Sequence, residues 1–187
     1  MRGLRRAALL SSGPARLSEV FEKGSRMEPE WYGKRTLVLG CGNWLLGDDG
    51  FGPAVVKRLT SDVAVGPDVC IMDAGTSVRE VLFDVTLSEN RPEKVVIVDA
   101  IDCSREPGEL FNLDIDSMPQ ARFADFSSHQ VPTSSLLRDL RDLCGVDVVV
   151  IACQVLNRDT EVGPGLSEPV EKAVHRAVEA VSREHIG

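Results

Sequence analysis

Apolar positions along the chain fall into two patterns, and the first is a set of short, almost continuous apolar runs. They occupy residues 36–40, 69–75, 94–101, 107–115 and 146–155. Runs of this length predict strands, and an unbroken apolar run indicates a strand that is covered on both faces. The run at 107–115 instead alternates between apolar and polar residues, which predicts a strand at or near an edge of the sheet.

The second pattern is helical spacing in the segments between these runs. It predicts one helix starting near Phe51, a second opened by the capping-box pair Ser77 and Glu80, and two more over 133–145 and 167–185. Strands that alternate with helices indicate an α/β fold. We expect a three-layer α/β/α sandwich with a twisted, mostly parallel sheet of about five strands.

The N-terminal 33 residues differ from the rest of the chain. Residues 1–17 carry arginines and no acid, and their apolar piece is too short and interrupted for a secretory signal. Met27 opens a more natural start. We expect residues 1–33 to be a disordered extension or, up to residue 26, a start-site artefact, and residues 34–187 to form a single domain.

Composition narrows the possible partners. The chain has 187 residues, 43% of them hydrophobic, and a net charge of −8 without a visible basic face, so neither nucleic acid nor a membrane surface is an expected partner. No apolar stretch approaches the roughly 20 residues of a membrane-spanning helix. The cysteines are odd in number and widely spread, which favours free thiols in a reduced, cytoplasmic protein.

Polar residues gather where the predicted strands end, which is where open α/β sheets bind ligands. They are Asn43, Asp48, Asp49, Asp73, Thr76, Asp99, Asp102, His129, Gln130, Gln154 and Asn157. Singly, each has an ordinary explanation. Asp48 is placed to cap the helix that follows, Asp49 suits the positive end of that helix, and Asp99 ends a strand where a turn begins.

The glycine-rich turn after the first strand, LGCGNWLLGDDGFG, does not fit a nucleotide site. Leu45 stands where a dinucleotide fingerprint requires its third glycine, and Asp48 and Asp49 would repel a phosphate. Acids at this position attract a cation instead. Two carboxylates and one imidazole form an incomplete ligand set, which suits a metal that brings other ligands with it.

Several segments together resemble the hydrogenase maturation endopeptidases. They are LVLGCGNWLLGDDGFGP, IMDAGTS, VVIVDAID, SSHQ and GPGLSEPV, in this order and spacing, and the likeness covers about residues 35–183. The residues after HQ and the last segment look most like the branch that serves coenzyme F420-reducing hydrogenases. The resemblance implies an endopeptidase that removes the C-terminal extension of a [NiFe] hydrogenase large-subunit precursor after nickel insertion.

The resemblance also implies the site residues. Asp49, Asp99 and His129 fall on the family's metal-contacting positions, so they are the expected catalytic and nickel-binding residues. The nickel is supplied by the substrate precursor, no organic cofactor is implied, and the protein is expected to act as a monomer. Relatives often carry Glu where this chain has Asp49, and the shorter side chain places its oxygens differently.

Two other functions stay open at this point. One is a nickel checkpoint that binds the precursor without cutting it. The other is a thiol hydrolase in which Cys41 is the nucleophile and His129 the base. The second requires an exposed Cys41 with a lowered pKa, and the neighbouring acids act in the opposite direction.

Overall fold

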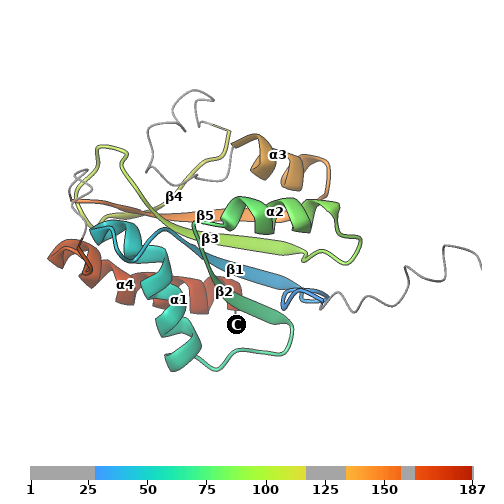
Figure 1. Ribbon diagram of the computed structural model, residues 1–187, viewed down its shortest axis with the longest axis horizontal. Helices are drawn as coiled ribbons and strands as arrows, with labels where there is room; N and C mark the ends of the chain where they lie inside the picture. The colour runs from blue at the N-terminus through green and yellow to red at the C-terminus, as the bar shows by residue number, and fades with distance from the viewer. Residues whose placement is uncertain (1–27, 117–133, 157–162, 187) are drawn as a thin grey trace, which may run out of the picture.

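Five strands form one sheet in the order β2-β1-β3-β5-β4, in a computed structural model that describes residues 28–116, 134–156 and 163–186 (Figure 1). Neighbouring strands are parallel except for β4, which runs antiparallel to β5 at the edge of the sheet. The strands are β1 (Thr36–Cys41), β2 (Val69–Gly75), β3 (Lys94–Ile101), β4 (Leu110–Asn112) and β5 (Asp147–Gln154). The expected five-stranded, mostly parallel sheet is confirmed.

Helices cover both faces of this sheet. They are α1 (Phe51–Asp62), α2 (Val78–Leu87), α3 (Ser134–Asp142) and α4 (Glu168–Val181), with a 3₁₀ turn, η2 (Gly47–Gly50), before α1 and a π-type turn, η4 (Ser182–Ile186), after α4. Figure 1 shows α1 and α4 on one side of the sheet and α2 and α3 on the other. The three-layer α/β/α architecture is therefore confirmed.

The central strand β3 explains why its sequence is apolar without interruption. Successive side chains of a strand point to opposite faces. Val95 and Ile97 pack into the core beneath α2 and α3, whereas Val96 and Val98 pack into the core beneath α1 and α4. Each face of the strand is thus buried under a helix layer, which leaves no position for a polar residue until Asp99.

Two glycines bring the first turn of α1 against the ends of β1 and β3. A Cβ at Gly40 would lie 2.5 Å from the carbonyl oxygen of Gly52, and one at Gly52 would collide with the carbonyl oxygens of Cys41 and Val98. Only a residue without a side chain permits this approach. The glycine-rich turn is therefore used for close packing of helix on strand.

Two local expectations were too broad or wrong. Strand β4 covers Leu110–Asn112 and not the whole of 107–115, although Gly108 and Leu113 on either side of it also donate backbone hydrogen bonds to β5. Ser77 is the N-cap of α2 as predicted, but its side chain makes no capping hydrogen bond. A capping-box pattern gives the residue types for the two reciprocal bonds and does not ensure that they form.

The packed part of the chain begins before residue 34. Trp31 is buried in the core with Leu37, and the backbone N–H of Lys34 donates to the carbonyl of Trp31. The expected boundary between residues 33 and 34 is therefore wrong for residues 28–33. The prediction for residues 1–26 falls outside the described residues.

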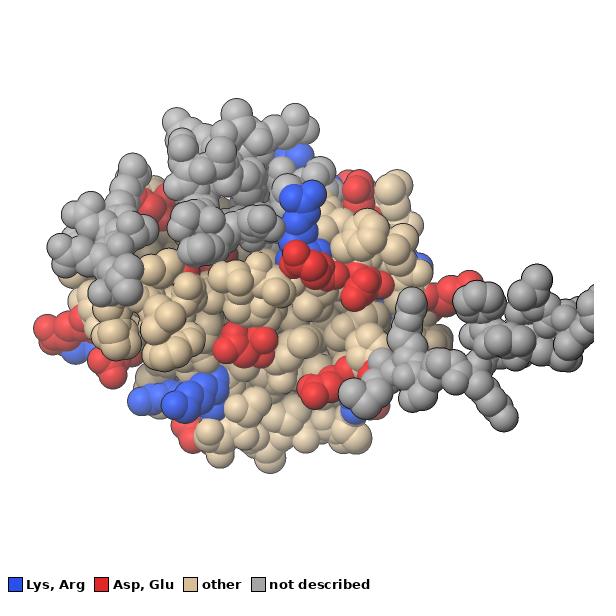
Figure 2. All heavy atoms as spheres, in the orientation of Figure 1, with Lys and Arg blue, Asp and Glu red and all other residues tan. Residues whose placement is uncertain are grey.

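The surface and the cysteines agree with the composition. All five cysteines are free thiols. None of the described helices combines the length and the apolar character needed to cross a bilayer. Figure 2 shows acidic and basic side chains in small groups on one face, with no broad basic patch among the described residues there.

Candidate active site at the carboxyl ends of β1 and β3

The carboxyl ends of β1 and β3 form the topological switch point of the sheet. After β1 the chain continues through α1 to β2, which lies on one side of β1. On the other side of β1 lies β3, and β5 and β4 extend the sheet beyond it. Ligands of open α/β sheets bind in the crevice at such a point. Asp49 follows β1 and Asp99 lies near the end of β3, so both expected site residues are at this position.

Asp49 is held by the turn that precedes it. Gly42 has a φ of +116°, and a Cβ there would collide with the carbonyl oxygen of Asp49. The backbone N–H of Asn43 donates to Oδ2 of Asp49 over 2.6 Å. Gly42 and Asn43 therefore fix the position of the Asp49 backbone and side chain before any ligand arrives.

Asp99 is a buried acid with little to compensate its charge. The residue is 5% exposed, and its side chain accepts a hydrogen bond from the backbone N–H of Ala100 over 2.8 Å. Burial first, and then the charge of Asp49, raise the pKa of Asp99 to about 7, against the smaller effect of the Ala100 bond. No Lys or Arg of the described residues forms an ion pair with Asp99. Such a site favours either a proton or a metal cation.

Cys41 lies on the same face as Asp99, at the end of β1, and it is 2% exposed. Burial, followed by the charges of Asp99, Asp73 and Asp49, raises the pKa of this thiol well above its usual range. A nucleophilic cysteine needs the opposite, an accessible thiolate. The thiol-hydrolase hypothesis is therefore inconsistent with the environment of Cys41.

Asp48 has a different role from the expected one. Gly50 is the N-cap of α1, and no side chain caps that helix. Asp48 accepts hydrogen bonds from the backbone N–H of Leu156 over 2.9 Å, and from the N–H and hydroxyl of Ser167 over 2.7 and 2.9 Å. Ser167 is the N-cap of α4. Asp48 thus connects the turn before α1 to the connection between β5 and α4.

Other acids at this edge of the sheet have structural partners. Oδ1 of Asp73 accepts from the N–H of Gly75 over 2.9 Å, which is the turn expected after a strand. The buried Gln154 uses its Oε1 to accept from the N–H groups of Cys103 and Arg105, and its Nε2 donates to Asp102 over 3.1 Å. This amide shapes the loop after β3.

The third expected ligand, His129, lies outside the described residues, as do Gln130 and Asn157. Within 28–116, 134–156 and 163–186, no group of three His, Cys, Asp or Glu residues could hold a metal ion. The structure thus brings Asp49 and Asp99 to one place, and the proposed role of His129 stays a prediction.

Two features of this site could not be predicted from the sequence. Asn43 was one of several polar residues at the strand ends, and only the fold shows that its N–H holds Asp49. Trp44, the next residue, is 60% exposed and lines a pocket beside the site. An apolar residue in a turn does not by itself indicate that the residue is exposed or that it lines a pocket.

Comparison with known proteins agrees with this geometry. The sequence profile of the hydrogenase maturation protease family, HycI, matches residues 53–184. A protein assigned as a hydrogenase maturation protease in Methanocaldococcus jannaschii is 41% identical over 79% of this chain and 94% of its own length. The coenzyme F420 hydrogenase subunit delta of Methanothermobacter thermautotrophicus is 35% identical over 80% of this chain and 94% of its own.

A solved structure shares the fold. The crystal structure of the [NiFe] hydrogenase maturation protease HycI from Thermococcus kodakarensis superposes with a TM-score of 0.65 at 29% identity, over 80% of this chain and 91% of that one. The sequence resemblance, the sheet order and the place of Asp49 and Asp99 agree with one another. This chain therefore belongs to the hydrogenase maturation protease family and is a peptidase.

Proposed function

We propose that this peptidase removes the C-terminal extension of a [NiFe] hydrogenase large-subunit precursor, and that it recognises the nickel already inserted in that precursor through Asp49, Asp99 and His129. The observation that carries the proposal is the buried carboxylate of Asp99 beside Asp49, in a chain related to [NiFe] hydrogenase maturation proteases. The protein acts as a monomer in the cytoplasm, and nickel belongs to the substrate.

The chemistry of the two acids supports a cation from the substrate. A second negative charge close to a buried carboxylate is unfavourable, and a divalent ion placed between them would reverse the sign of the interaction. Carboxylate and imidazole ligands suit a borderline ion such as Ni²⁺. Two carboxylates and one imidazole would leave positions for the ligands that the precursor itself supplies.

Nickel bound in this way would identify a loaded precursor and hold the adjacent peptide bond in the cleft. Hydrolysis then adds water across the C–N bond of the peptide. The environment of Cys41 provides no thiolate for this step. The contribution of the chain is to position the precursor, since Asn43 and Gly42 fix Asp49 and the sheet fixes Asp99.

The relatives also support the assignment of this chain to one branch of the family. The 35% identity to a coenzyme F420 hydrogenase subunit covers most of both chains. We therefore propose as substrate the large subunit of a hydrogenase that reduces coenzyme F420 or a similar deazaflavin.

The test is processing of a purified precursor with and without nickel. The wild type should shorten only the nickel-loaded precursor, which mass spectrometry of the product would show. Asp49→Asn and His129→Ala should each lose at least about 100-fold in processing rate, because an amide oxygen or a methyl group is a poor replacement for a metal ligand. Circular dichroism should show that both variants are folded.

Cys41→Ser is the matched control at the same site. It should keep near-normal activity, because the thiol has no assigned task. Efficient cutting of nickel-free precursor by the wild type would refute nickel recognition. Binding of loaded precursor without any cutting would indicate the checkpoint function.

A further inference from the structure

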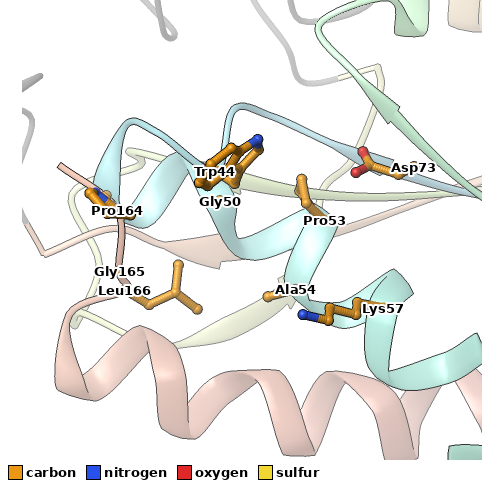
Figure 3. A pocket seen from close by; sticks show the side chains of 10 residues that line it. Trp44, Gly50, Pro53, Ala54, Lys57, Asp73, Pro164, Gly165 and Leu166 are labelled. Atoms are coloured by element: carbon orange, nitrogen blue, oxygen red, sulfur yellow. The ribbon is translucent and has the colours of Figure 1, made fainter. Parts of the chain in front are cut away.

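A pocket next to the candidate site has no assigned role. It has a volume of about 330 Å³ and is lined by residues of the turn after β1, the first turns of α1, the end of β2 and the segment before α4. Figure 3 shows Trp44, Pro53, Ala54, Pro164 and Leu166 around the same space. The lining is mostly apolar, with Lys57 and Asp73 as its charged members.

Trp44 is an exposed aromatic residue in the lining of this pocket. This residue is 60% exposed, and the neighbouring Leu45 is 42% exposed. A tryptophan ring that is exposed to water lacks the favourable free energy that burial of its apolar surface would provide. Exposed tryptophans beside a cavity are frequent anchors of protein interfaces.

The turn that carries Trp44 is fixed by hydrogen bonds on both sides. Before it, the side chain of Asn43 accepts from the N–H of Leu45 over 3.0 Å. After it, the carbonyl of Leu45 accepts from the N–H of Gly163 over 3.0 Å, and the N–H of Gly47 donates back to Gly163 over 3.1 Å. An aromatic side chain on a fixed backbone loses little entropy when it binds.

The pocket shares a turn with the candidate active site, because its lining residues Gly47 and Gly50 flank Asp49 in the chain. Asn43, which directly precedes Trp44, donates its backbone N–H to the carboxylate of Asp49. Asp73 lines the pocket and acts on the Cys41 thiol together with Asp49 and Asp99. A polypeptide whose nickel reaches Asp49 and Asp99 therefore has this pocket within reach of the residues that flank its scissile bond.

We propose that this pocket binds an apolar side chain of the precursor segment next to the cleaved bond, with Trp44 and Leu166 on either side of it. The inference rests on the proposed function, because it takes the hydrogenase precursor as the ligand. The commitment to a peptide follows from the place of the pocket, since Gly47 and Gly50 line it and flank Asp49 in the same turn.

The first experiment is steady-state processing of nickel-loaded precursor by Trp44→Ala and Ala54→Trp. Trp44→Ala removes an aromatic side chain from the lining of the pocket, and Ala54→Trp places a large side chain from α1 inside it. Both should raise KM at least ten-fold and leave kcat within about two-fold, because the pocket binds substrate and transition state equally. Leu143→Ala is the matched control and should change neither KM nor kcat, because Leu143 is 80% exposed and does not line the pocket. KM values within two-fold of wild type for both pocket variants would refute the proposal.

The second experiment separates this inference from the proposed function. The chain has two tryptophans, and Trp31 is buried, so the difference between wild type and Trp44→Phe isolates the emission of Trp44. Titration with the precursor should shift that emission to the blue. A shift without cleavage would support the pocket and refute the peptidase assignment to this substrate. Cleavage without a shift would refute the pocket alone.

Two further measurements would reveal whether something other than the precursor occupies the pocket. If a second copy of this chain fills the pocket, sedimentation velocity will show a dimer for the wild type and a monomer for Trp44→Ala. If the chain covers its own pocket, Trp44 will already emit as a buried residue in the free protein. Either result would overturn the proposal.

Discussion

Asp48 and Asp49 are adjacent in the chain, yet their carboxylates meet different parts of the molecule. Asp48 binds Leu156 and the N-cap Ser167, whereas Asp49 binds Asn43 and faces Asp99 closely enough to raise its pKa. One acid holds the fold around the site, and the other belongs to the site itself. The two should therefore respond in opposite ways to substitution.

We predict that Asp48→Ala destabilises the protein by roughly 2–4 kcal/mol, because it leaves the N–H groups of Leu156 and Ser167 without their acceptor. Asp49→Asn should change stability by less than about 1 kcal/mol and abolish processing. Urea denaturation measures the first effect, and the precursor assay measures the second. A stable but inactive Asp48→Ala would show that Asp48 has a direct role in the reaction.

Asp99 predicts a dependence of stability on pH. Its folded pKa of about 7 lies above the ordinary value of 3.8, so the folded state binds this proton more tightly than the unfolded state. The resulting stability is fully present below about pH 4 and is lost as pH rises through about 7. Asp99→Asn, which cannot ionise, should therefore be more stable than wild type at pH 8 by a few kcal/mol.

The measurement is the melting temperature of wild type and Asp99→Asn between pH 4 and pH 8. The difference should be small at pH 4 and grow towards pH 8. Asp84→Asn, at an exposed position of α2, is the control and should show no such trend. A constant difference across this range would mean that Asp99 is already ionised in the folded protein at pH 4.

At the scale of elements, the sequence was informative wherever periodicity decided the structure. Strand β3 and the four long helices were predicted because their apolar spacing reports burial directly. The short β4 and the uncapped start of α2 were not, because pairing partners and side-chain rotamers are set by tertiary contacts. The same limit applies to Asp48, whose partners lie more than one hundred residues away.

The contact between α1 and the ends of β1 and β3 gives a sharp test at this scale. Gly52→Ala should destabilise the protein by about 3 kcal/mol or more, because the new methyl group would overlap the carbonyl oxygens of Cys41 and Val98. Gly66→Ala is the control, since a Cβ there meets open space. It should be neutral or slightly stabilising. Thermal unfolding of both variants distinguishes a packing requirement from a general cost of losing glycine.

At the scale of the whole molecule, the sheet order explains why the functional residues meet. Asp49 and Asp99 are fifty residues apart, and they converge because β1 and β3 are parallel neighbours that end at the same edge. The alternation of strands and helices predicted that edge as the ligand site, and the family resemblance selected these residues from among several acids there. Neither could predict the pocket at Trp44, because its walls come from segments that only the folded chain brings together.

The extent of the folded unit gives the last prediction. A protein that starts at Met27 should melt and process precursor like the full chain, because it keeps the buried Trp31. One that starts at Lys34 should be less stable by about 3–5 kcal/mol, the usual cost of removing a buried tryptophan side chain. Trp31→Ala in the full chain is the matched control, and it should account for most of that loss. Equal melting temperatures for the proteins starting at Met27 and Lys34 would show that Trp31 contributes nothing to the core. A large loss on starting at Met27 would show instead that residues 1–26 stabilise the domain.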